Sequence, residues 1–312
     1  MQLLLQSIKT EMNKVIIGRG LEIDLLLIAL LQEGHVLFES VPGTGKTLMA
    51  KTFAETISAD FKRIQFTPDV LPSDVTGIHF FNPKNQQFEL RPGPIVTNIV
   101  LADEINRATP RTQSSLLEVM EERQVTIEGE TLLLDTPFMV IATQNPVESQ
   151  QGTFPLPAAQ LDRFLMKIPF QYPTLKEEQN ILQRFKGQTE LENIHSVLAK
   201  SQLASLTTGV KNVQVSEDIE LFILELVRKT REHHYIELGV SPRGGLALLR
   251  AAQGKALLEN RSYVIPDDVT YLAPYVLNHR IQLTLEASLT KSIDKVMSDI
   301  MKEIQVPVEQ GG

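Results

Sequence analysis

The stretch that most constrains the fold reads VLFESVPGTGKTLMAKTF and runs from Val36 to Phe53. An apolar run breaks into Pro-Gly-Thr-Gly-Lys-Thr, and a helical pattern follows at once. Glycine is costly inside regular structure, because it loses more conformational freedom on folding than other residues. Two glycines beside one lysine therefore indicate a tight turn that joins a buried strand to a helix.

Five short runs before Pro173 predict β-strands. Several are apolar throughout rather than alternating, as in a parallel sheet that helices cover on both faces. Helical patterns lie between them, and the clearest has Thr109 as a cap and Pro110 in its first turn. The pattern predicts an α/β fold with a five-stranded parallel sheet. The strand runs are 35–39, 62–66, 98–103, 138–143 and 164–170.

The character of the chain changes after residue 172. Strand-like runs stop, and amphipathic helical patterns follow, such as the one from Ser216, where this serine can cap the helix, and another from Ser241. We therefore expect an α/β domain over 1–172, an all-helical domain over 173–306 and a flexible tail over 307–312.

Composition narrows the class of protein. The chain has no cysteine, which excludes disulfides, thiolate metal sites and a cysteine nucleophile and favours a reducing compartment. Its longest apolar run, LLLIALL over 25–31, is too short to span a bilayer, and its first residues lack the basic start of a signal peptide. We expect a cytoplasmic protein with no membrane segment.

The charge balance is acidic. The formal net charge is -8, and neither half of the chain is basic. Proteins that bind nucleic acid usually carry a basic face, which releases counterions from the phosphates. The charge therefore favours protein partners over nucleic acid.

The glycine-rich turn predicts phosphate binding. Backbone N–H groups at a helix N-terminus bind phosphate, and glycines let the phosphate come close. In the P-loop pattern G-x-x-x-x-G-K-[ST], the lysine reaches the β- and γ-phosphates and the hydroxyl holds Mg²⁺. Ser40 replaces the first glycine, whereas the end of the pattern matches. The expected nucleotide ligands are Gly43, Thr44, Gly45, Lys46, Thr47 and Leu48.

Acidic and amide groups follow two later strands. The run IVLADE ends in Asp103 and Glu104, which point opposite ways as neighbours on a strand. Asp103 can reach Mg²⁺, and Glu104 can act as general base on a water that attacks phosphate. Asn145 follows MVIATQ and could orient that water. The alternatives are a solvated acidic pair and a plain turn.

Together these residues resemble the MoxR family of AAA+ ATPases, and the resemblance covers nearly the whole chain. It implies a P-loop α/β domain with a C-terminal helical lid, ATP and Mg²⁺ as cofactors, and a hexameric ring with sites between subunits. The most specific matching segments are IQFTPDVLPSDVTG (64–77), FELRPGPIVTNIVLADEINRATPRTQSSLLEVMEERQVTIEG (88–129), FMVIATQNPVESQQGTFPLPAAQLDRF (138–164) and SPRGGLALLRAAQ (241–253).

The resemblance also implies roles for the residues around the phosphates. Lys46 and Thr47 would form the Walker A motif, Asp103 and Glu104 the Walker B motif, and Asn145 sensor 1. Ile17 and Gly18, in IIGRG, resemble the loop that packs on adenine in related ATPases, although a plain loop is the alternative.

Four arginines receive roles in the same way. Arg163 would be the arginine finger that reaches a neighbouring subunit's γ-phosphate; the alternative is a salt bridge with Asp162. Arg243 would be sensor 2 on the lid, or else a solvated arginine. Arg107 and Arg111 are candidates for subunit contacts, or else solvated charges at the start of a helix.

The implied activity is ATP hydrolysis to ADP and phosphate, coupled to chaperone-like remodelling of protein complexes, often with a partner that carries a von Willebrand A (VWA) domain. A magnesium-chelatase motor subunit is one alternative, and a nucleotide-gated scaffold is disfavoured by Glu104 and Arg163. A nucleic-acid motor is another, but its basic pore hairpin is missing, because EERQVTIEGETLLL has one arginine against four glutamates. This hairpin and the helix-2 insert that precedes PGPI should face the ring pore.

Overall fold

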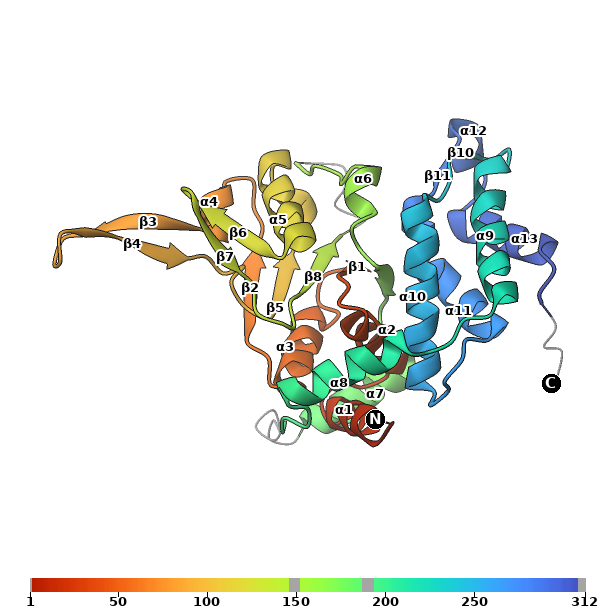
Figure 1. Cartoon of the computed structure of the whole chain (residues 1–312), viewed down its shortest axis with the longest axis horizontal. Coiled ribbons are helices and arrows are strands. Elements are labelled where there is room, and N and C mark those ends of the chain that lie inside the picture. Colours follow the sequence, from red (N-terminus) through yellow and green to blue (C-terminus); the bar gives the residue numbers. More distant parts are fainter. Residues whose placement is uncertain (1, 146–151, 187–193, 308–312) are drawn as a thin grey trace.

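The computed structural model describes residues 2–145, 152–186 and 194–307. Figure 1 shows an α/β half with a central sheet, a long hairpin that projects from this half, and a helical half on the opposite side. Within the described part of the chain, no helix has the length and apolar character needed to cross a membrane.

Five parallel strands form the central sheet in the order β2-β5-β8-β1-β9, so the predicted five-stranded parallel sheet is confirmed. β8 lies between β1 and β5, which places it beside the strand that precedes the glycine-rich turn. Each predicted run overlaps one strand. The strands are β1 (Val36–Ser40), β2 (Phe61–Gln65), β5 (Ile99–Asp103), β8 (Met139–Gln144) and β9 (Met166–Phe170).

The two faces of the sheet belong to different apolar cores, which explains the continuous apolar runs. In β5, Ile99 and Leu101 join one core, whereas Val100 and Ala102 join the other. The first core includes α1 (Gln2–Asn13), α2 (Gly20–Leu31) and α3 (Lys46–Thr56), and the second includes α5 (Pro110–Glu122). Helices therefore cover both faces, as the sequence predicts.

The two predicted helix caps are present: Thr109 caps α5, and Ser216 caps α9 (Glu217–Glu232). Ser241 caps α10 (Pro242–Leu258) in the same way, and each of the three side chains accepts a hydrogen bond from the backbone N–H of the third helical residue. The helical half also contains α11 (Pro266–Leu277), α12 (Leu285–Ser288) and α13 (Ile293–Glu303), whereas α7 (Leu175–Phe185) and α8 (Lys200–Lys211) lie near α1 in Figure 1.

The helical half packs directly on the α/β half. α10 crosses α2 at Gly254, where an added Cβ would lie 2.9 Å from Cγ2 of Ile28. Leu203 and Leu206 of α8 belong to the same core as one face of the sheet. Because the core is continuous, the domain boundary after residue 172 stays a prediction, and residues 308–312 of the expected tail lie outside the described residues.

The expectation of an all-helical second half is wrong in one detail. β10 (Ile236–Leu238) and β11 (Gln282–Leu283) pair in antiparallel fashion between the helices. Strands this short have no room for a recognisable period, so the sequence pattern could not predict them.

Two hairpins leave the α/β half on the side away from the helical half. β3 (Gly77–Asn82) and β4 (Gln87–Pro92) form the long projecting hairpin in Figure 1, just after α4 (Pro72–Thr76). β6 (Gln124–Ile127) and β7 (Glu130–Leu133) form the second. The imidazole of His79 lies 3.3 Å from Glu128 and 3.4 Å from Glu130, so the two hairpins meet.

Candidate active site

The glycine-rich turn gives α3 an N-terminus that is open to an anion. Gly43 and Gly45 have φ values of 77° and 90°, in the left-handed region that favours glycine. α3 begins at Lys46, and no side chain caps its first turn. The Lys46 ammonium forms no hydrogen bond or ion pair with the residues that the structure describes. Free N–H groups and a free ammonium thus meet at the end of β1, where phosphate would be stabilised.

A cavity of about 190 Å³ lies beside this turn. Ile17 forms part of its wall, whereas Gly18 does not line it. Gly18 instead has a φ of 73° and lies against the side chain of Glu177 in α7, so it shapes the loop that carries Ile17. Of the expected nucleotide ligands, those that line the cavity are Ile17, Gly43, Thr44, Gly45 and Leu48.

Sequence reasoning did not assign several other residues that line this cavity, among them Arg19, Phe170 and Ile181. The guanidinium of Arg19 lies 4.3 Å above the ring of Phe170, and Ile181 of α7 forms another part of the wall. An apolar wall with a flat guanidinium suits a planar aromatic base. Phe170 ends the strand next to β1, and only this strand order could have indicated its place.

The two acids lie at the carboxyl end of β5, and each is held by hydrogen bonds. Asp103 is buried; it accepts hydrogen bonds from the Thr143 hydroxyl at 2.6 Å and from Arg63 at 2.6 Å. Glu104 has a left-handed φ of 58° and accepts a hydrogen bond from Gln65 at 2.9 Å. A left-handed backbone conformation costs about 1 kcal/mol or more at a residue other than glycine, so the surrounding fold must impose it on Glu104.

Three other predicted residues, Asn145, Arg107 and Arg111, follow strands β8 and β5 in sequence. Asn145 is buried and directly follows β8, so the structure places it at the same sheet edge as Asp103 and the end of β1. Arg107 forms an ion pair with Glu104 at 3.1 Å, and Arg111 is exposed in the first turn of α5.

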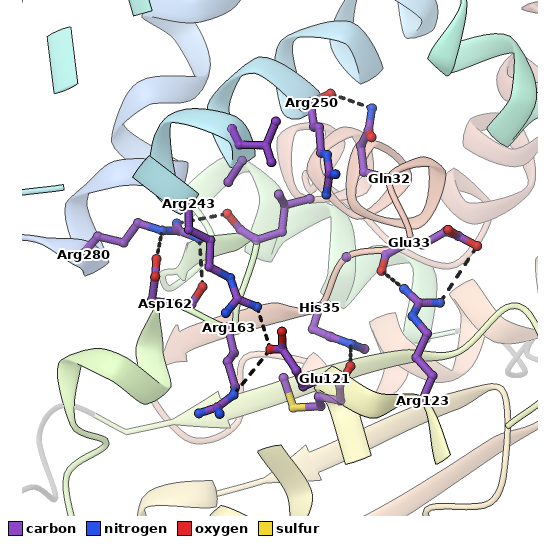
Figure 2. A pocket seen from close by; sticks show the side chains of 15 residues that line it. Gln32, Glu33, His35, Glu121, Arg123, Asp162, Arg163, Arg243, Arg250 and Arg280 are labelled. Carbon is purple, nitrogen blue, oxygen red and sulfur yellow. Dashed lines mark hydrogen bonds and ion pairs between the residues drawn. The ribbon is translucent and has the colours of Figure 1, made fainter. Parts of the chain in front are cut away.

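A second cavity, of about 300 Å³, is lined by residues at the end of α5 and the start of α10 and by no residue of the glycine-rich turn. Figure 2 shows the side chains that line it. It contains the two other predicted arginines, Arg163 and Arg243, and none of the predicted phosphate or Mg²⁺ ligands. We call it the arginine cavity. Its lining residues are Gln32, Glu33, Gly34, His35, Met120, Glu121, Arg123, Asp162, Arg163, Leu165, Arg243, Leu246, Ala247, Arg250 and Arg280.

The predicted alternative for Arg163, a salt bridge with Asp162, is wrong. Asp162 instead pairs with Arg280 at 2.7 Å and accepts a hydrogen bond from the Ser241 hydroxyl at 3.1 Å. Arg280 is 3% exposed and also donates to the carbonyl of Phe164, so it joins the helical half to the loop after α6 (Ala158–Leu161). Sequence reasoning missed Arg280, because no motif contains it.

His35 forms the buried floor of the arginine cavity. Its Nδ1 accepts a hydrogen bond from the backbone N–H of Val140 at 2.9 Å, so its Nε2 donates to the carbonyl of Met120 at 3.1 Å. Burial lowers the pKa of His35 to about 4, because the charged form would lose its hydration. The imidazole is therefore neutral at pH 7 and fixes the end of α5 to the sheet.

Comparison with known proteins identifies similar chains over nearly the full length. The family model for the ATPase family associated with various cellular activities (AAA) matches residues 35–166, and the AAA lid domain model matches residues 228–303. The chain is 39% identical over 307 residues to Chaperone MoxR1 of Mycobacterium tuberculosis, covering 95% of this chain and 81% of that protein.

Two further matches are as extensive. The chain is 52% identical over 301 residues to the uncharacterized protein YeaC of Bacillus subtilis, covering 96% of this chain and 94% of that one. A crystal structure of a candidate ATPase from Cytophaga hutchinsonii superimposes with a TM-score of 0.92 at 39% identity, covering 98% of this chain and 96% of the other.

The buried imidazole of His35 predicts a loss of stability in mild acid. The unfolded chain binds a proton near pH 6.5 and the folded chain only near pH 4, so stability falls as the pH drops through this window. His35 alone should contribute about 3 kcal/mol to this loss. Urea unfolding from pH 7 to pH 4 should show a shallower pH dependence for His35→Gln than for the wild type. His195→Gln, at an exposed histidine, should keep the wild-type slope; equal slopes for all three would contradict the assignment.

Proposed function

Because this chain belongs to the MoxR family of chaperone-like AAA+ ATPases, we propose that it binds ATP with Mg²⁺ and hydrolyses ATP to ADP and phosphate. One observation carries the proposal: the parallel order β5-β8-β1 gathers the open turn before α3, Asp103, Glu104 and Asn145 at a single sheet edge. These are the groups that phosphoryl transfer to water requires.

Phosphate and metal would be held by the start of α3 and the end of β5. The Lys46 ammonium pairs with the β- and γ-phosphates, and the N–H groups of Gly43, Thr44 and Gly45 surround them. Mg²⁺ prefers hydroxyl and carboxylate oxygens, and Thr47 and Asp103 provide this donor set. Asp103 keeps acceptor capacity beyond its bonds with Thr143 and Arg63, because a carboxylate has about four lone-pair positions. Mg²⁺ neutralises phosphate charge when bound.

Hydrolysis would rely on Glu104 as general base. Its carboxylate takes a proton from water while the water oxygen bonds to the γ-phosphorus, and the bond from that phosphorus to the bridging oxygen of ADP breaks. Asn145 orients the water. The adenine lies in the cavity of about 190 Å³, against Ile17 and Leu48. Glu104 is held by Gln65 and Arg107 in this structure, so it must exchange one of these partners for water.

Arg163 and Arg243 would act on a neighbouring subunit in a homo-oligomeric, hexameric ring. Both line the arginine cavity, which contains none of the chain's own phosphate ligands. Their side chains are 33% and 49% exposed, so a neighbour can reach them. An arginine finger spreads positive charge over the transferred phosphoryl group, and the family resemblance gives Arg163 this role.

The projecting hairpin supports a protein client. Phe81 and Phe88 are 52% and 73% exposed, and their rings pack edge to face 5.5 Å apart. Exposed aromatic pairs suit an apolar protein surface rather than a phosphate backbone. We assign to this ATPase the remodelling of protein complexes, with the two hairpins facing the ring pore and a VWA-domain partner by family resemblance.

Removal of the phosphate-binding ammonium should weaken ATP binding. Lys46→Ala should raise the dissociation constant for ATP by about tenfold or more, because a charge-assisted contact to phosphate is lost. Lys51→Ala removes an exposed lysine from the same helix and should bind ATP like the wild type. Titration calorimetry measures both. Equal affinity of all three proteins would refute the phosphate role of Lys46.

Removal of the finger should stop hydrolysis but not ATP binding. Arg163→Ala should lose on the order of 10³-fold in kcat, while its affinity for ATP stays close to wild type, because the finger acts on another subunit's phosphate. Glu104→Gln should be inactive for a different reason. A mixture of the two variants forms some interfaces with both groups intact, and it should regain turnover. If mixing restores nothing, the finger does not act between subunits.

The client can be trapped on the non-hydrolysing ring. Glu104→Gln loaded with ATP should retain a protein complex, together with a VWA-domain protein, in a pull-down from the source cell that is read by mass spectrometry. Lys46→Ala is the matched control, because it should not load ATP. Recovery of chelatase subunits or nucleic acid with the trap alone would replace the remodelling role and leave the ATP site as proposed.

A further inference from the structure

Glu121 holds two arginines from different halves of the chain with one carboxylate oxygen. Its Oε2 lies 2.6 Å from Nη2 of Arg243 and 3.5 Å from Nε of Arg163, as Figure 2 shows. Arg163 lies in the loop after α6, and Arg243 lies in the first turn of α10. Two guanidinium groups this close repel one another, so the shared carboxylate is what allows them to lie together.

The other carboxylates of the arginine cavity are already engaged. Asp162 pairs with Arg280, and Glu33 pairs with Arg123 at 3.9 Å. Glu121 is therefore the carboxylate that remains for Arg163 and Arg243 among the lining residues.

The position of Glu121 is unfavourable for its own helix. It lies in the last turn of α5, which has no basic residue there, and a negative charge at a helix C-terminus is disfavoured by the helix dipole. A residue that breaks a local rule in this way points to a role outside the helix. The hydrogen bond from Arg243 lowers the pKa of Glu121, so the carboxylate stays charged at neutral pH.

The contact between Glu121 and Arg163 involves Nε and leaves the two terminal nitrogens of the guanidinium available. Glu121 approaches Nε, at a distance too long for a hydrogen bond, and no described residue accepts a hydrogen bond from the Arg163 guanidinium. Its two terminal nitrogens, which form the fork that suits phosphate, thus remain open. Arg280 differs, because it is buried and donates to Asp162 and to backbone carbonyls.

We propose that Glu121 is a positioning residue for ATP hydrolysis: its carboxylate aligns Arg163 and Arg243 so that both meet the same phosphate of a neighbouring subunit. The inference rests on the proposed function and adds a third residue to its arginine side. Glu121 touches no phosphate itself. It couples the lid to the α/β half, because Arg243 reaches the shared position only when α10 is docked near α5.

Subunit mixing tests this role. Glu121→Gln should lower kcat by about tenfold or more, the scale on which small misplacements of catalytic groups act, with unchanged affinity for ATP. Glu122→Gln removes the same charge from the same helix end, at an exposed residue without a described ion pair, and should match the wild type. Mixing Glu121→Gln with Glu104→Gln should restore turnover, whereas mixing it with Arg163→Ala should not, because both then lack the same half of the site.

The outcomes separate this inference from the proposed function. Glu121→Gln with the turnover of Glu122→Gln, with higher turnover than the wild type, or with rescue by Arg163→Ala would overturn the positioning role while ATP hydrolysis stands. A wild-type chain without ATP turnover would overturn both. Thermal melts check folding. If Glu121→Gln does not fold, Glu121→Asp replaces it, because aspartate keeps the charge on a shorter side chain. Its kcat should be lower than that of the wild type, and it should regain turnover when mixed with Glu104→Gln but not with Arg163→Ala.

Discussion

The two hydrogen-bonded ladders on either side of β8 are the constraint on which the rest of the candidate site depends. They set Phe38 of β1 opposite Thr143, and Ala102 of β5 opposite Ala142. The Thr143 hydroxyl can then donate to Asp103 at 2.6 Å and accept from the backbone N–H of Glu104 at 2.9 Å. One threonine thus fixes both acids relative to the strand that carries the phosphate turn. Because both sheet faces are buried, a slip of one residue would exchange the two cores, which makes this register costly to change.

The candidate site residues of the chain lie in two places. The proposed phosphate ligands and the proposed general base lie at the carboxyl end of the strands, whereas the arginines of the arginine cavity lie where α5 ends and α10 begins. In the proposed ring, the arginines would come from a neighbouring subunit, because none of them lies beside the chain's own Lys46. The complete charge arrangement would then exist only after assembly, so the proposed turnover would depend on assembly.

The sequence predicts the parts of this protein that obey local rules. Continuous apolar runs predict the five strands, and Thr109 and Ser216 predict two helix starts, because burial on two faces and helix capping act within a few residues. The glycine-rich turn is predictable for the same reason. The short pair of β10 and β11 is not, since two or three residues carry no period. Phe170 and Arg19 reach the base-sized cavity only through the strand order and the path of the first loop.

The arginines show why residue type and motif are not enough. Adjacency in sequence favours an ion pair between Asp162 and Arg163. The structure gives Asp162 to Arg280, whose donors also reach buried carbonyls, and this satisfied, desolvated arginine is structural. The Arg163 guanidinium donates no hydrogen bond to the described residues and is partly exposed, and its buried Nε is costly to leave without an acceptor. The number of satisfied donors therefore distinguishes a structural arginine, such as Arg280, from one that is available to a partner, such as Arg163. That number depends on contacts between residues far apart in the sequence, so sequence motifs do not give it.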